Sequence, residues 1–187
     1  MKYRTIVADP PWPYGRRWAN GSNPSKGFTG KGGPRPLPYP TMTLDEIAAL
    51  PVSDLIHGDG AHLYLWTTNR FLPDTFRIVE AWGFTYSQML VWAKTPAGKG
   101  PGGAFAQNAE YAIFARAGLP ITNDRVESVW FNWKRTSVHS RKPPAFLDLV
   151  EQVSPGPYVE LFSRETAPRF GWDYWGDQSL GTAEMAA

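Results

Sequence analysis

An acidic residue, two prolines and a tryptophan follow a short apolar run near the start of the chain, at Asp9, Pro10, Pro11 and Trp12. Proline carries no N–H, and it pushes the residue before it toward an extended conformation. The Asp9 carboxylate and the neighbouring carbonyl oxygens are thus offered as acceptors for both hydrogens of a planar amino group, while Trp12 or Tyr14 stacks on the attached ring. Such acceptors favour a nitrogen that can attack a methyl group, and they stabilise its developing positive charge. The residues therefore suit methylation of an exocyclic amine.

The same four residues also have a purely structural interpretation. In that case the prolines end a strand, Asp9 caps a turn and Trp12 fills the core. Because the two prolines come with flanking aromatic residues at the end of an apolar strand, the functional interpretation is favoured.

The elements that must position these residues alternate between strands and helices. Strands are predicted over residues 3–8, 61–68, 84–94, 109–118 and 158–164, and helices over residues 44–50, 72–82 and 144–153. Thr43 and Glu46 form a capping box, Asn69 is expected to cap the second helix, and Gly83 is expected to end it. The alternation predicts an α/β fold with a mostly parallel central sheet flanked by helices, whose ligands gather beyond the carboxyl ends of the strands.

Length and composition narrow the class of protein. The 187 residues suit a single domain over residues 1–187, with flexible loops near residues 18–40, 95–108 and 130–143. A net charge of +2 excludes a polybasic protein that coats nucleic acid non-specifically. The absence of Cys excludes disulfides and a Cys nucleophile. The three His residues are scattered, so no metal site is expected. No apolar run is long enough to cross a bilayer, and we expect a soluble cytoplasmic protein.

Besides the Asp-Pro-Pro-Trp stretch, six further motifs follow along the chain. In order, the seven are ADPPW, LPYPTMTLDEIAALPV, LYLWTTNRFLPDTFRIVEAWGF, VWAKT, HSRKP, VELFSR and WGDQ. Together they cover nearly the whole chain and resemble the MT-A70 family of S-adenosylmethionine-dependent N6-adenine methyltransferases. The resemblance implies a Rossmann-like methyltransferase fold, and it implies that Asp9, Pro10, Pro11 and Trp12 hold the amino group of the target adenine.

The resemblance also implies where the methyl donor, S-adenosyl-L-methionine, binds. The residues that it assigns to the donor, besides Asp9, are Ser140, Lys142, Arg164, Asp177 and Gln178. Ser140 and Lys142 precede a predicted helix and could bind the methionine carboxylate by hydroxyl and charge. Arg164 and Asp177 suit ribose hydroxyls. Relatives with WGNQ carry Asn where Asp177 stands, which changes the expected contact.

Substrate contacts are expected from side chains in loops and at strand ends. The assigned residues are Tyr14, Tyr39, Lys94, Lys134 and Arg135, and Glu110 is a further acidic candidate that orients basic neighbours. Basic and aromatic residues are interleaved around several of them, which suits a nucleic-acid strand whose target base has left its stack. Solvated loops beside an aromatic core are the alternative.

The function that these features predict is methyl transfer to N6 of adenine in nucleic acid, with DNA favoured by analogy to small bacterial and phage members. RNA N6-adenine methylation is the first alternative. N4-cytosine methylation and a non-catalytic nucleic-acid-binding subunit are the others, and self-association of the chain is left open.

Overall fold

A computed structural model describes residues 1–14, 40–94, 104–134, 142–163 and 169–176. Within these ranges one seven-stranded sheet has the order β5-β3-β4-β2-β1-β6-β7. The strands are β1 (Thr5–Ala8), β2 (Gly60–Thr67), β3 (Thr85–Ala93), β4 (Ala109–Gly118), β5 (Trp130–Phe131), β6 (Tyr158–Leu161) and β7 (Trp172–Trp175). The pairs β1–β2, β1–β6, β6–β7 and β3–β5 are parallel, whereas β4 is antiparallel to both β2 and β3. Every strand except β4 therefore points toward the same edge of the sheet, and the predicted parallel-rich sheet is confirmed.

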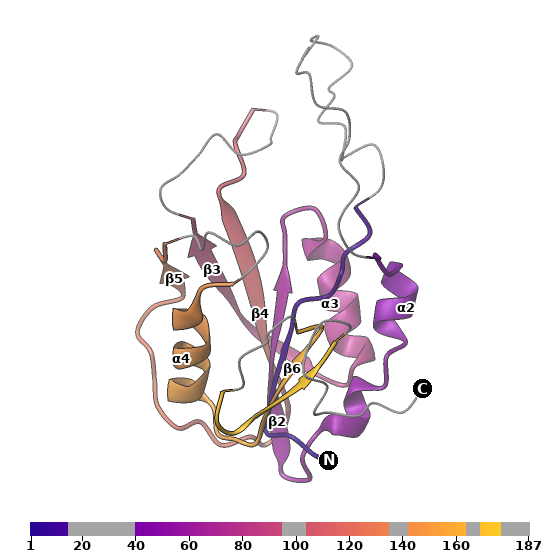
Figure 1. The fold of residues 1–187 in the computed structure, drawn as a ribbon, viewed down its shortest axis with the longest axis vertical. Coiled ribbons are helices and arrows are strands. Elements are labelled where there is room, and N and C mark those ends of the chain that lie inside the picture. Colours follow the sequence, from indigo (N-terminus) through magenta and orange to yellow (C-terminus); the bar gives the residue numbers. More distant parts are fainter. Residues whose placement is uncertain (15–39, 95–103, 135–141, 164–168, 177–187) are drawn as a thin grey trace.

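Helices cover both faces of this sheet, as the sequence predicts. Figure 1 shows α4 on one side, with α2 and α3 together on the other. The helices are α2 (Leu44–Ala48), the 3-10 helix η1 (Val52–Leu55), α3 (Leu72–Ala81) and α4 (Pro144–Val153). In the described part of the chain, none of the helices has the length and apolar character needed to cross a membrane.

Two buried clusters fill the spaces between the sheet and the helices. Ile6 and Leu63 belong to the cluster under α2 and α3, and Val7 and Tyr64 belong to the cluster under α4. Successive side chains of a strand point to opposite faces. Since both faces are covered, β1 and β2 are buried at every position, which explains their continuous apolar runs.

The helix ends test the predicted caps. Thr43 and Glu46 form the predicted capping box at the start of α2. The prediction for Asn69 is wrong, because α3 begins later, with Phe71 at the N-cap and no side-chain hydrogen bond there. Gly83 ends α3 as predicted: its φ of +82° is one that side chains disfavour, and its N–H donates to the Glu80 carbonyl.

Two strands are missing from the prediction, and a third ends earlier than predicted. Strand β5 falls inside residues 130–143, which the sequence predicts as a loop, and β7 is not predicted at all. A strand as short as β5 has too few residues to show a period, whereas β7 does alternate, with Trp172 and Tyr174 buried. Strand β6 ends at Leu161 rather than at residue 164, because Phe162 has a φ of 61° and turns the chain.

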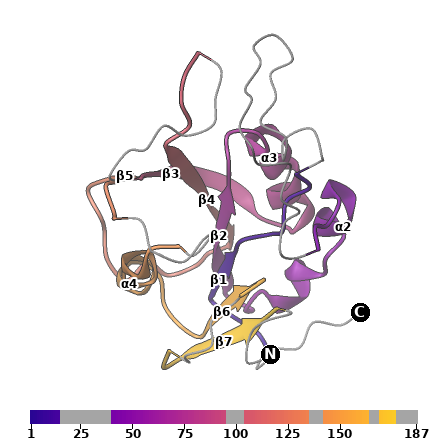
Figure 2. The same cartoon turned by 45° about the horizontal axis from the view of Figure 1, so that its top comes forward.

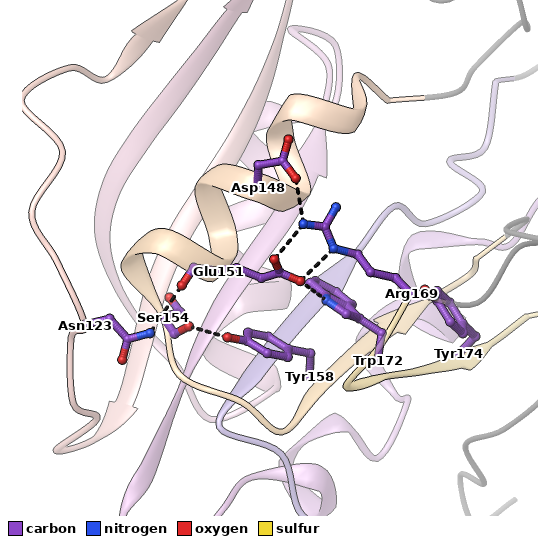
Figure 3. Close-up of polar contacts among 8 residues, drawn as sticks. All are labelled: Asn123, Asp148, Glu151, Ser154, Tyr158, Arg169, Trp172 and Tyr174. Carbon is purple, nitrogen blue, oxygen red and sulfur yellow. Dashed lines mark hydrogen bonds and ion pairs between the residues drawn. The ribbon is translucent and has the colours of Figure 1, made fainter.

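Polar contacts tie β7 to α4 (Figure 3). The Arg169 guanidinium donates two hydrogen bonds of 2.6 Å to the Glu151 carboxylate and another of 2.6 Å to Asp148. The Trp172 indole N–H also donates to Glu151, at 2.7 Å. Such a forked pair fixes direction as well as distance, so it sets how the outer strand lies against the helix.

Candidate active site

The edge to which most strands point collects residues that lie far apart in the sequence. Asp9 follows β1, Lys94 follows β3, and Lys142 lies just before α4. Because β4 runs the opposite way, its first residues, including Glu110, reach the same edge. Figure 2 turns this edge toward the viewer. The antiparallel direction of β4 therefore brings Glu110, near the start of this strand, to the same edge as Asp9.

These four residues form a chain of alternating charges. The Lys142 ammonium donates to the Asp9 carboxylate at 2.7 Å and lies 3.2 Å from the Glu110 carboxylate. Lys94 pairs with the other oxygen of Glu110. The side chains of Lys142 and Glu110 are only 18% and 17% exposed, while that of Asp9 is 32% exposed. Asp9 is thus the member of the chain most open to a ligand.

Burial and neighbouring charges act in opposite directions on these groups. Burial alone would lower the pKa of Lys142, but the charges of Asp9 and Glu110 outweigh it and raise the pKa above its ordinary value. Burial would raise the pKa of Glu110, yet Lys142 and Lys94 lower it below its ordinary value. Both groups are therefore charged at neutral pH.

Two tryptophan rings make cation–π contacts with Lys142 and Lys94. The Lys142 ammonium lies 5.1 Å from the Trp66 ring centroid, and the Lys94 ammonium lies 5.1 Å from that of Trp92. Such cation–π contacts hold an ammonium over an apolar floor. Strand periodicity places both tryptophans on the face of α4, but no local signal in the sequence pairs them with the lysines.

The Asp-Pro-Pro backbone is fixed by hydrogen bonds. The Pro10 carbonyl accepts the Trp12 N–H at 2.8 Å, and the Pro11 carbonyl accepts the Met42 N–H at 3.0 Å. Since a carbonyl oxygen has two lone pairs, these bonds leave each oxygen capacity for another donor. The expected acceptors are thus present, although the carbonyl oxygens are not free of backbone partners.

Trp12 differs from its expected role of stacking on a target base. Its side chain is 4% exposed, its ring stacks on Phe71 at 5.2 Å between centroids, and its indole N–H donates to the Trp66 carbonyl at 3.2 Å. No face of a ring buried in this way is open to a base. Trp12 instead anchors the loop that carries Asp9, which corresponds to the structural alternative for this one residue.

Tyr14 is the aromatic residue of this loop that remains partly exposed. Its hydroxyl lies 3.0 Å from the Thr68 hydroxyl at the end of β2, and its ring meets Phe71 edge-on. Burial raises the pKa of Tyr14, and the nearby Glu110 and Asp9 charges add to the effect. A neutral tyrosine beside Asp9 is suited to pack against a base, and Thr68, which the sequence analysis does not name, fixes its position.

The remaining predicted residues divide into two groups. Lys134 is exposed and follows Trp133, whose carbonyl accepts the Trp92 indole N–H at 2.9 Å. The others lie outside the described residues: Tyr39, Arg135, Ser140, Arg164, Asp177 and Gln178. Their roles stay predictions.

A close backbone approach marks the neighbouring ends of β6 and β7. The Ser163 N–H donates to the Trp175 carbonyl at 3.0 Å. A Cβ on Gly176 would lie 2.5 Å from the Ser163 carbonyl oxygen, so only glycine fits. Among the described residues, the opposite charges of Asp9 and Lys142 fit a donor that carries an amino-acid group.

A mixed sheet with helices on both faces and an acceptor loop at its carboxyl edge is typical of Rossmann-like methyltransferases. The MT-A70 family model matches residues 3–178, and the chain belongs to this family. This confirms the resemblance that the ordered motifs indicate.

Relatives from bacteria, plants and animals agree with this assignment. The Type II methyltransferase M.MunI from Mycoplasma sp is 30% identical over 185 residues, which cover 94% of this chain and 77% of that protein. A putative N(6)-adenosine-methyltransferase MT-A70-like protein of Medicago truncatula is 29% identical over 96% of this chain and 27% of its own length. The human N(6)-adenosine-methyltransferase catalytic subunit METTL3 is 24% identical over 96% of this chain and 29% of its own length. The chain thus spans less than a third of these plant and human relatives.

Proposed function

We propose that the protein transfers a methyl group from S-adenosyl-L-methionine to the N6 amino group of adenine in DNA. The observation that carries the proposal is the Asp9 carboxylate, partly exposed beside the Pro10 carbonyl at the carboxyl edge of the sheet. An acid and a carbonyl next to each other can accept the two hydrogens of one amino group. Membership of the MT-A70 family supports the same reaction.

Asp9 and Pro10 would hold the amine in the orientation that the reaction needs. As the nitrogen bonds to the methyl group it gains positive charge, which the Asp9 carboxylate stabilises. Lys142 fixes the carboxylate through its hydrogen bond, and Trp12 fixes the backbone through Phe71 and Trp66. Tyr14 would pack against the base.

The donor would lie along the same edge and supply an electrophilic methyl group. Lys142 would bind the carboxylate of the donor, and Asp9 would bind the amino group of the donor. These two side chains present opposite charges near the start of α4. The resemblance adds Ser140, Arg164, Asp177 and Gln178 to the proposed donor site.

The relatives favour two different polymers. DNA is proposed because the relative that this chain covers for 77% of its length is a Type II methyltransferase. RNA is the alternative, because the plant and human relatives are described as N(6)-adenosine-methyltransferases. Local contacts must provide the affinity for either polymer, since the net charge is only +2.

Turnover with defined substrates tests the proposal. The protein is incubated with methyl-labelled S-adenosyl-L-methionine and with sequence-matched single-stranded DNA, duplex DNA or RNA, and the nucleosides are separated by mass spectrometry. Label in N6-methyldeoxyadenosine is expected. Label in N6-methyladenosine alone would move the substrate to RNA, and label in cytosine would overturn the base assignment. Donor binding without label in any nucleic acid would indicate a non-catalytic subunit.

A further inference from the structure

A hollow of about 430 Å³ opens beside the candidate active site, between the end of β2 and the segment that leads into β4. Its lining includes the amide side chains of Asn69, Gln107 and Asn108 and the rings of Phe105 and Tyr111. Among the described residues, no acidic or basic side chain lines it. The volume falls within the range of about 300–1,000 Å³ that is usual for small-ligand sites.

The lining suits a nucleobase. Asn and Gln side chains carry a donor and an acceptor side by side, which matches the edge of a base, adenine above all. An aromatic ring stacks on any base regardless of its sequence. Phe105 is 87% exposed, so its ring is open to such a partner. Uncharged amides with an open ring are the means by which proteins read single-stranded or unstacked bases.

The position of the hollow connects it to Asp9. Asn69 directly follows Thr68, whose hydroxyl lies 3.0 Å from that of Tyr14, and β1, β2 and β4 are consecutive strands. Neighbouring strands lie about 4.8 Å apart and each residue advances about 3.3 Å along a strand. Since Asn69 lies three positions and Gln107 five positions beyond the level of Asp9, the hollow is on the order of 10–20 Å from Asp9. Stacked nucleotides are spaced by about 3.4 Å, so this separation corresponds to roughly three to six stacked nucleotides, and to fewer where the target base has left its stack.

Two further features agree with a bound nucleic-acid strand. Glu110 lies between Ala109 and Tyr111 in β4, so its side chain points to the face of α4 while the hollow lies on the other face. The target base would then lie on the α4 side of the sheet edge, and the flanking base would lie in the hollow on the other side. The exposed Arg70 guanidinium, 5.2 Å from the Phe71 ring centroid, adds a cation next to Asn69 that suits a phosphate.

We propose that this hollow binds a nucleobase that flanks the target adenine on the same strand, and that it thereby sets which bases are preferred near the methylated site. Phe105 stacks on the flanking base, while Gln107 and Asn69 bind its edge. The inference rests on the proposed function, because it names the part of the same substrate that surrounds the target.

Randomised substrates test the hollow. Pools of single-stranded DNA, duplex DNA and RNA carry a target adenine between positions randomised among all four bases, and the methylated molecules are recovered and sequenced so that each methylated adenine is located. The variants are Phe105→Ala and Gln107→Ala. Their matched controls are Phe170→Ala, which removes another fully exposed ring, and Gln152→Ala, which removes an exposed amide at the far end of α4.

We expect Gln107→Ala to flatten the base preference at one flanking position and to leave the other positions unchanged. We expect Phe105→Ala to lower kcat/KM about 5- to 150-fold, mainly through KM, because one base stack is lost. Both controls should match the wild type. Variants that methylate with the wild-type flanking profile and kcat/KM would overturn the inference and leave the proposed function intact.

A wild-type protein that methylates none of the three pools would overturn the proposed function instead. Fluorescence anisotropy with the same oligonucleotides then tests separately whether the hollow contributes to nucleic-acid binding. Weaker binding by Phe105→Ala than by Phe170→Ala supports it, and equal affinities overturn it. If Phe105→Ala instead disrupts self-association in sedimentation velocity while the flanking profile is kept, the hollow binds protein and the inference is wrong.

Discussion

At the scale of single residues, the site depends on a partly buried lysine between two acids. Lys142 contacts Asp9 and Glu110, and Lys94 forms a second ion pair with Glu110. Removing charges from water is costly, and the cost is offset only when each charge has a well-placed partner. Lys142 therefore holds the Asp9 carboxylate in place at an edge where an isolated carboxylate would be free to move.

Replacing Glu110 tests this arrangement. Glu110→Gln leaves Lys142 and Lys94 without their shared acid, so we expect the free energy of unfolding at pH 7 to fall by about 3 kcal/mol. The pKa of Glu110 lies below its ordinary 4.5, so its contribution is complete above that pH and is lost as the pH falls below it. Urea unfolding at pH 7 and pH 4 measures both effects. The exposed Glu127→Gln is the control, and a loss no larger than in the control would contradict the arrangement.

The sequence could predict the types of these residues but not all of their partners. Asp9, Lys94 and Lys142 are named from their motifs and Glu110 as a further acidic candidate. The contact between Asp9 and Lys142 spans 133 positions and depends on strand order. Trp12 could not be placed either, because a buried and an exposed aromatic residue look alike beside a proline pair.

At the scale of elements, strand β4 and the ends of α4 determine what reaches the edge. The sequence predicts β4 and α4 with the bounds that the structure has, but strand direction follows from tertiary pairing and not from local pattern. At its far end α4 is joined to β2 by a buried network in which the Ser154 hydroxyl lies 2.7 Å from both the His62 ring and the Tyr64 hydroxyl. This network fixes the helix whose other end carries Lys142.

The network makes stability depend on pH. Burial, together with the charge of Arg116, lowers the pKa of His62 from 6.5 to about 4. The unfolded chain then binds a proton more readily than the folded protein. We expect the free energy of unfolding to be undiminished above about pH 6.5 and to fall as the pH drops from there toward about 4. His62→Asn should remove this slope in urea titrations, whereas His57→Asn should keep it; equal slopes in the wild type and His62→Asn would contradict the assignment.

At the scale of the whole molecule, one edge of the sheet is proposed to bind both substrates. Asp9, Lys142 and the hollow at Asn69 all lie at the edge where the carboxyl ends of neighbouring strands meet. Alternation of strands and helices is sufficient to predict this edge, and the ordered motifs are sufficient to predict the family. The hollow could not be predicted, because its amides come from a turn and from a loop that carry no periodic signal.

Binding of the donor should therefore stabilise the whole fold. At 100 times its Kd, S-adenosyl-L-methionine should add about 2.7 kcal/mol, which corresponds to a rise in Tm of roughly 5–10 °C for a chain of this size. Differential scanning fluorimetry measures the rise. Lys142→Gln should lose most of it, whereas the exposed Lys2→Gln should retain it. A full rise in Lys142→Gln would show that the donor binds elsewhere.

The most direct measurement of the central claim compares Asp9→Asn with the wild type under single-turnover conditions, with saturating donor and quantification of N6-methyldeoxyadenosine. Asn keeps the shape of Asp9 but loses its charge, so the developing positive charge on the amine is no longer stabilised. Asp59→Asn, at the opposite edge of the sheet, is the control, and circular dichroism verifies the fold. We expect a rate at least about 100-fold lower for Asp9→Asn and an unchanged rate for the control. Methylation by Asp9→Asn at the wild-type rate would contradict the proposed role of Asp9.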